Sequence, residues 1–273
     1  MENEFPPEWH AVGRQIDLAI AQIRSGIAAL GKANHAAGGL YTQAFFGLSI
    51  GLERMAKLAI VADHLLTHDG AFLTDAELRG YNHNLGRLLT ACEAFGPNYA
   101  EAPYDARPND PIHVAIVQVL SDFAQTTRYF NLNFLSGTVR GNDPIPAWWN
   151  SVGEAIIERH VSIAAAARID AKVDAFQRIY GQHADVFHHD EGGNQIRDFR
   201  ALALRSEQTA YVQRYGRMYV LQIVRWLGAI LTGESRQCEE RGFLAFRGLY
   251  ETTMPLLQPD KYLLSRKTVY ERG

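Results

Sequence analysis

The chain has 273 residues and a formal net charge of −3, from 27 Lys and Arg against 30 Asp and Glu. This length suffices for a substantial core, and this charge argues against a whole surface that binds nucleic acid regardless of its sequence. We expect no secretory signal from the polar, acidic start and no membrane span, because no run of about eighteen apolar residues occurs. With two cysteines and no CxxC pair, a reduced cytoplasmic protein is expected.

The spacing of apolar residues predicts helices along most of the chain. An apolar stripe from Trp9 to Leu30 follows two prolines, and a long apolar helix is expected from Tyr41 to His68. Later helices are expected over 83–95, from 111 towards 129, over 148–180, from 196 to about 231 and over 238–257. Strand signals are weak throughout, so the predicted fold class is all-α, a helical bundle.

Two positions in the second half are expected to interrupt the pattern. Gly233 and Ser235 separate the last two predicted helices. Glycine and proline between residues 137 and 146 mark the best internal boundary. We therefore expect an N-terminal helical core over 1–137 and a helical C-terminal extension over 138–273, which either packs with the core as one domain or folds separately.

Two short motifs occur in succession in the first half: Leu52-Glu53-x-x-x-Lys57 and Tyr81-Asn82-His83-Asn84-Leu85-x-x-Leu88-Leu89. Glu53 and Lys57 are one helical turn apart, so their spacing alone predicts a solvent-exposed ion pair worth about 0.2–0.5 kcal/mol. Together the two motifs resemble the HEPN superfamily, with asparagine in place of the usual glycine and aspartate around His83. The resemblance covers about residues 41–137.

The resemblance implies a compact α-bundle that often forms a homodimer and that in many members is a metal-independent RNase. In those members an arginine is followed after four to six residues by a histidine. The histidine acts as general base on a ribose 2′-hydroxyl, and the arginine stabilises phosphate charge. Arg128 stands at the matching place, but Asn133 stands where the histidine is needed. An amide cannot take that proton, so a binding or scaffolding member is favoured.

Two other arginine–histidine spacings fit the same pattern. Arg178 precedes His183 with four residues between them, and Arg107 precedes His113 with five. The pair of Arg178 and His183 is the better one, because Arg178 closes a predicted helix beside a polar loop, whereas His113 lies in an apolar helix. The catalytic candidates are therefore Arg178, His183 and Arg128.

The loop over 183–194 is the richest segment in potential metal ligands, with His188, His189 and Asp190 in a row. Imidazole and carboxylate suit zinc, manganese or iron, and a distant ligand such as His160 would complete a site. The His-Asp dipeptide also resembles that of HD-type phosphohydrolases. A solvated loop is the preferred interpretation, so we assign no metal ligand and no cofactor.

Arginine and aromatic residues are interleaved over 197–225. Because arginine holds phosphate and aromatic rings stack on bases, Arg200, Arg214, Arg217 and Tyr215 are the candidates for binding nucleic acid or a protein partner. The same stripe suits a structural helix whose arginines pair with carboxylates, and this interpretation is preferred.

The sequence thus predicts a HEPN-like, non-catalytic component that binds RNA or protein in a prokaryotic defence or toxin–antitoxin-like system, a setting that rests on the resemblance alone. Two alternatives stay open: a metal-independent RNase with an Arg–His pair, and a metal-dependent phosphohydrolase built on the His-rich loop. Walker, G-x-G-x-x-G, H-E-x-x-H and G-x-S-x-G motifs are absent, which disfavours ATPase, dehydrogenase and hydrolase-elbow functions.

Overall fold

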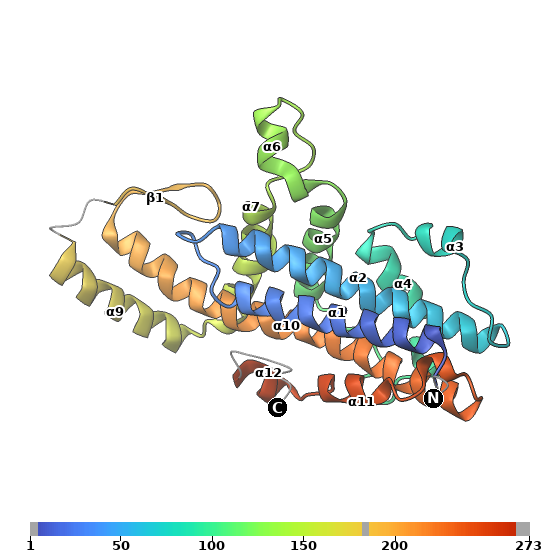
Figure 1. Ribbon diagram of the computed structural model, residues 1–273. Coiled ribbons are helices and arrows are strands. Elements are labelled where there is room, and N and C mark those ends of the chain that lie inside the picture. The colour runs from blue at the N-terminus through green and yellow to red at the C-terminus, as the bar shows by residue number, and fades with distance from the viewer. Residues whose placement is uncertain (1–4, 182–185, 266–273) are drawn as a thin grey trace.

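A computed structural model of the protein describes residues 5–181 and 186–265 (Figure 1). Within these ranges the chain is a helical bundle with one two-stranded hairpin, which confirms the predicted all-α class. In the same ranges, no helix combines the length and the apolar character that crossing a membrane requires.

The first half contains, in chain order, α1 (Pro7–Leu30), α2 (Gly39–Thr67), α3 (Asp75–Arg79), α4 (Leu85–Phe95), η1 (Gly96–Asn98), α5 (Pro111–Gln125), η2 (Thr127–Tyr129) and α6 (Phe130–Leu135). The second half contains α7 (Pro144–Trp148), η3 (Trp149–Gly153), α8 (Glu154–His160), α9 (Ile163–Tyr180), β1 (His188–His189), β2 (Gln195–Ile196), α10 (Phe199–Glu240), η4 (Leu244–Phe246), α11 (Tyr250–Thr253), η5 (Met254–Leu256) and α12 (Asp260–Ser265). The two strands are antiparallel.

Helices α1 and α2 form a closely packed antiparallel pair at the centre of the bundle (Figure 1). Glycine allows this approach. A Cβ at Gly47 would lie 2.6 Å from the carbonyl oxygen of Gln22, and one at Gly51 would lie 2.9 Å from that of Ala19. Both distances are too short for non-bonded atoms, so the two backbones can touch only because these positions lack side chains.

Helix α10 runs unbroken for 42 residues, so the prediction that Gly233 and Ser235 interrupt it is wrong. Gly233 serves a different purpose: a Cβ there would lie 2.0 Å from the carbonyl oxygen of Tyr99, and glycine lets that segment cross the helix. The buried Ser235 hydroxyl donates to the carbonyl of Phe246 at 2.8 Å. Cys238, the predicted start of the last helix, lies within α10 and is buried and free, as is Cys92.

The helix predicted over 148–180 begins earlier and is broken. It starts at Pro144, where Asp143 accepts a hydrogen bond from the N–H of Ile145 at 3.0 Å. The chain then leaves helical geometry after α8, and the Ser162 hydroxyl caps α9 by accepting from the N–H of Ala165 at 3.2 Å. An N-cap serine satisfies a new helix start, so one predicted helix becomes several.

Helix α10 packs against α1, α2 and α5, so residues 138–273 share a hydrophobic core with residues 1–137 in the described part. Two segments extend beyond this core in Figure 1. Helix α6 projects from the end of α5, and α9 lies along the first half of α10 to form an arm that the β1–β2 hairpin covers.

Candidate functional site

The turn between α3 and α4 positions His83 beside α2. Asn82 has a φ of 49°, a left-handed conformation that asparagine tolerates better than most residues. Asn84 then caps α4, its side-chain oxygen accepting from the N–H of Arg87 at 2.9 Å. The predicted helix over 83–95 therefore begins two residues late, at Leu85, and His83 is left in the turn with its ring free to face α2.

His83 and Lys57 share the carboxylate of Glu53. Lys57 Nζ donates to Glu53 Oε1 at 2.7 Å, and His83 Nδ1 lies 3.0 Å from Oε2. The Glu53 side chain is only 14% exposed, so the predicted solvent-exposed ion pair is in fact partly buried and has a third member. Because a carboxylate only accepts, Nδ1 carries the proton in this contact, and a neutral ring then presents its Nε2 lone pair outward.

These side chains face a cleft of about 510 Å³ between α1, α2, the α3–α4 turn and the end of α5. We call it the cationic cleft; its lining residues are Gln15, Ile50, Glu53, Arg54, Lys57, Leu58, Val61, Leu78, His83 and Arg128. Three cations thus stand against one carboxylate. The remaining wall is mostly aliphatic, which weakens water screening of these charges.

Two of the three cations have no carboxylate partner in the described part of the chain. Arg54 bonds to the neutral amide of Gln15. Arg128 stacks on Phe46, with its guanidinium carbon 4.7 Å from the ring centroid, and its buried Nε lacks a hydrogen-bond partner. Guanidinium groups that the fold leaves without counter-charge are suited to hold an anion, and phosphate matches their planar donor geometry.

A second cavity lies on the other side of Arg128, at the base of α6. This α6 groove, of about 240 Å³, is lined by Thr42, Phe123, Thr127, Arg128, Tyr129, Phe130, Asn131, Leu132, Asp143, Pro144 and Ile145. Its wall is largely aromatic and aliphatic with a few hydrogen-bonding groups. Arg128 belongs to both walls, so the two cavities meet at that side chain.

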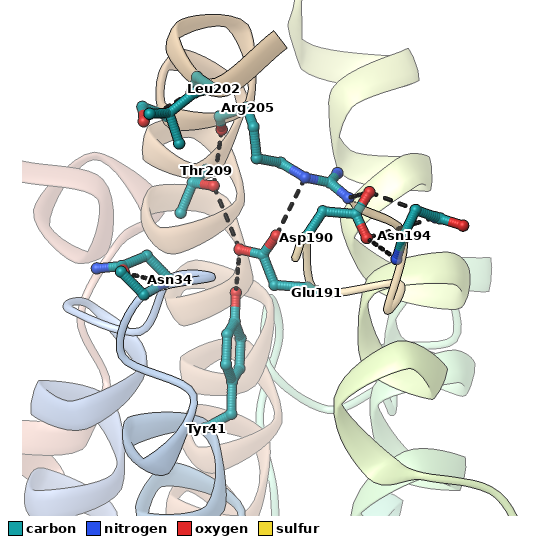
Figure 2. Close-up of polar contacts among 10 residues, drawn as sticks. Asn34, Tyr41, Asp190, Glu191, Asn194, Leu202, Arg205 and Thr209 are labelled. Atoms are coloured by element: carbon teal, nitrogen blue, oxygen red, sulfur yellow. Dashed lines mark hydrogen bonds and ion pairs between the residues drawn. The ribbon is translucent and has the colours of Figure 1, made fainter. Parts of the chain in front are cut away.

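The second polar cluster holds the β1–β2 hairpin against α10 (Figure 2). Arg205 contacts Asp190 at 2.6 Å and faces Glu191 at 3.1 Å, and its guanidinium carbon lies 3.8 Å from the Trp149 ring centroid. The hydroxyl of Tyr41 donates to Glu191 at 3.3 Å. We call these five residues the hairpin latch, and each charge in it has an opposite charge beside it.

The latch leaves Asp190 no free capacity as a metal ligand. Burial raises the pKa of its carboxyl, but the N–H of Asn194 and the charge of Arg205 outweigh burial and hold that pKa below its ordinary value. The described residues contain no group of three or more His, Cys, Asp and Glu side chains placed to hold a metal ion. His160, the distant residue considered as a further metal ligand, stacks on Tyr215 and lies 3.0 Å from the hydroxyl of Tyr219.

The four residues predicted to bind nucleic acid or a partner lie outside both cavities. Arg200 pairs with Asp170 and Asp174 of α9, as the structural interpretation of this stripe predicted. Arg214 is exposed at 5.6 Å from the ring centroid of Tyr215, and Tyr215 in turn stacks on His160.

Arg217 is half-buried on the same helix. Its Nε donates to the carbonyl of Gln213 at 3.0 Å, and burial together with the nearby charge of Arg214 lowers its pKa. Arg200 is thus engaged with α9, while Arg214, Tyr215 and Arg217 are neighbours on α10.

Among the predicted catalytic residues, Arg128 alone lies in a described cavity. Arg178 is exposed at the end of α9, and His183 lies outside the described residues. His113 is buried, with Nε2 2.7 Å from Gln222 Oε1, and it lines neither cavity.

Sequence reasoning missed that His83 and Glu53 belong to one site with Arg128. The available signal was that each of the two motifs that carry the family resemblance contributes to this cleft, Glu53 and Lys57 from the first and His83 from the second.

Comparison of the chain with known protein families, curated proteins and solved structures finds no match. The resemblance to the HEPN superfamily therefore stays a prediction, and the function must be argued from the cavity itself.

Proposed function

We propose that this protein binds RNA, with phosphate groups of the RNA backbone held in the cationic cleft. The observation that carries the proposal is the pair of guanidinium groups, Arg54 and Arg128, that line one cleft without any described carboxylate partner. The resemblance of residues 41–137 to an RNA-acting superfamily agrees with this ligand. It also supplies the proposed setting, a prokaryotic defence or toxin–antitoxin-like system in the cytoplasm.

A second candidate, metal-independent RNA cleavage, is favoured by the contact between Glu53 and His83. A carboxylate that fixes Nδ1–H leaves Nε2 to take the proton of a ribose 2′-hydroxyl. The 2′-oxygen then attacks phosphorus, the bond to the 5′-oxygen breaks, and that oxygen takes a proton from water. The products are a 2′,3′-cyclic phosphate and a 5′-hydroxyl, and Arg128 would balance the added charge on the phosphate.

The test of binding is fluorescence anisotropy with a labelled RNA of about twenty nucleotides in the presence of EDTA. Replacing both Arg54 and Arg128 by alanine is expected to weaken binding at least about tenfold. The slope of log K against log salt is expected to become shallower by the amount that about two phosphate contacts contribute. Arg200→Ala is the matched control, because that arginine is engaged with α9. Wild-type protein that does not bind at about 100 µM, or a double variant that binds like wild type, contradicts the proposal.

The test of cleavage uses the same RNA and separates the products by size. His83→Gln is expected to abolish any EDTA-resistant cleavage while leaving affinity unchanged. Cleavage that continues in this variant removes His83 from the candidate mechanism, and absence of cleavage by the wild type leaves binding as the function.

A homodimer is part of the same proposal and rests on the resemblance. Light scattering coupled to size exclusion gives the mass directly. A monomer mass at all concentrations used for RNA binding contradicts this part without affecting the cleft.

A further inference from the structure

We propose that the α6 groove is a pocket for one unpaired nucleobase, so that the complete site binds single-stranded rather than double-stranded RNA. This inference rests on the proposed function, since it places the base next to the phosphate held in the cationic cleft. It is carried by separate residues, those of η2, α6 and the start of α7.

The two cavities share one wall residue, Arg128. This side chain makes no ion pair with a described carboxylate, although Glu53 lines the cleft and Asp143 lines the groove. An anion seated against its guanidinium from the cleft side therefore has the α6 groove as its neighbour. In a nucleic acid, the group next to a phosphate along the chain is a sugar carrying a base.

The cavity wall is cationic in the cleft and largely aromatic in the α6 groove. Phe123, Tyr129 and Phe130 contribute to the wall of the groove, and the Tyr129 ring is 59% exposed. Exposed aromatic rings beside a cationic groove are the common means by which proteins hold unstacked bases. The chain between Asp122 and Asp143 carries no carboxylate, so Asp143 is the one carboxylate among the residues that line the groove.

Hydrogen-bonding groups in the groove match the edge of a base. Thr127 is 4% exposed, and its hydroxyl has no hydrogen-bond partner among the described residues, an unusual state for a buried polar group. Asp143 accepts from the N–H of Ile145 through Oδ1, which leaves its second oxygen to accept from an amino group of a base. Adenine, guanine and cytosine carry such a group and uracil does not.

A base can enter this groove only when it is not paired. In a duplex the base edges are engaged with each other, and the deep groove of A-form RNA keeps them from side chains. The α6 groove therefore selects for single strands, while the cationic cleft alone holds phosphates of either form.

The experiment measures anisotropy of labelled RNA of about ten nucleotides, single-stranded or as a duplex with its complement, at fixed salt. Wild-type protein is expected to prefer the single strand, and Tyr129→Ala to weaken single-strand binding about 5- to 100-fold with little effect on the duplex. The matched control is Phe176→Ala, which removes an exposed ring from α9 on the distant arm. Asp143→Asn retains the cap of α7 and is expected to reduce the preference for oligo-A over oligo-U.

Each outcome decides between the two proposals. Binding that is lost in the Arg54 and Arg128 double variant but unchanged in Tyr129→Ala overturns the base pocket and leaves RNA binding by the cleft intact. Equal affinity for single strand and duplex has the same meaning. Wild-type protein that binds neither RNA contradicts both. If Tyr129→Ala changes the mass of the particle in light scattering instead of RNA affinity, the groove is a protein contact and this inference is wrong.

Discussion

Arg205 in the hairpin latch and Arg128 in the cationic cleft are both guanidinium groups stacked on an aromatic ring, at 3.8 Å from Trp149 and 4.7 Å from Phe46. They differ in counter-charge. Arg205 forms ion pairs with two carboxylates, whereas Arg128 forms none in the described part of the chain, although Glu53 and Asp143 line the same cavities. The residue type and its aromatic support are therefore the same in a structural and in a candidate binding role. Pairing distinguishes the two roles, and it depends on the fold rather than on the local sequence.

The largest effect on stability is expected from Arg205→Ala. The truncation leaves Glu191, whose side chain is 1% exposed, without its cation, and breaking a buried ion pair in this way costs about 3–5 kcal/mol. Urea unfolding measures the loss. If the variant is too unstable to purify, Arg205→Lys retains the charge and is expected to recover part of the stability. An Arg205→Ala variant as stable as wild type means that the latch does not hold the hairpin.

A large effect is also expected from Glu234→Gln, which tests whether an unpaired group always signals a site. Glu234 is completely buried on α10, and neither carboxyl oxygen has a hydrogen-bond partner. Burial, assisted by the charge of Asp63, raises its pKa well above the ordinary value. Glu234 lines neither the cationic cleft nor the α6 groove, so we expect its lack of a partner to affect stability and not binding.

The sign follows from proton uptake. With a raised pKa in the folded state, the folded protein keeps a proton that the unfolded chain releases above its own pKa, so wild-type stability falls as pH rises between the two values. Glutamine imitates the neutral acid at every pH. Glu234→Gln is therefore expected to gain stability over wild type by up to about 1.4 kcal/mol per pH unit above pH 5 and to gain nothing below pH 4. Urea unfolding across this range checks it, and a difference independent of pH contradicts the neutral buried acid.

A smaller effect on stability, together with a clear loss of function, is expected from Arg128→Ala. Only the contact with Phe46 is lost, worth about 0.5–1 kcal/mol. RNA affinity is expected to fall about tenfold. Anisotropy and urea unfolding of the same preparation give both numbers. A loss of several kcal/mol in stability would place Arg128 with Arg205 as a structural residue and remove the contrast between them.

The smallest effect is expected from Arg200→Ala. Its ion pairs with Asp170 and Asp174 lie at the surface, where water and salt screen them. A slight decrease in the unfolding midpoint at low salt should disappear in about 1 M salt. RNA affinity should not change. A clear loss of affinity would restore this helix to the binding surface that the sequence suggested.

The sequence was sufficient for elements whose signal is local. The apolar period of three to four residues placed α2 within two residues of its observed bounds, Gly39–Thr67, because a helix that buries one face repeats apolar residues at every turn. Gly233 misled for the opposite reason. A glycine lowers helix propensity wherever it stands, and only the crossing of Tyr99, far away in sequence, shows why it is present inside α10.

The site was predictable only in part. Arg128 was recognised from its place in a motif, but the contact of Glu53 with His83 joins residues 30 positions apart and depends on the turn at Asn82. Arg128 has no carboxylate partner among the described residues, and residue spacing cannot predict which distant side chains fail to reach it. The reverse holds for Arg200, whose partners on α9 became visible only when the two helices were placed side by side.

The length of α10 also constrains how this protein can be made. Its apolar face closes the core over α1 and α2, yet about 130 residues separate the end of α2 from its first turn. At about 5–20 residues per second, a ribosome takes roughly six to twenty-six seconds to synthesise that segment. During this same interval the first helical pair is complete while the surface that α10 will cover remains exposed to water. The nascent chain therefore passes through a long period of vulnerability to aggregation, and its yield in cells should depend on chaperones that shield that surface until α10 arrives.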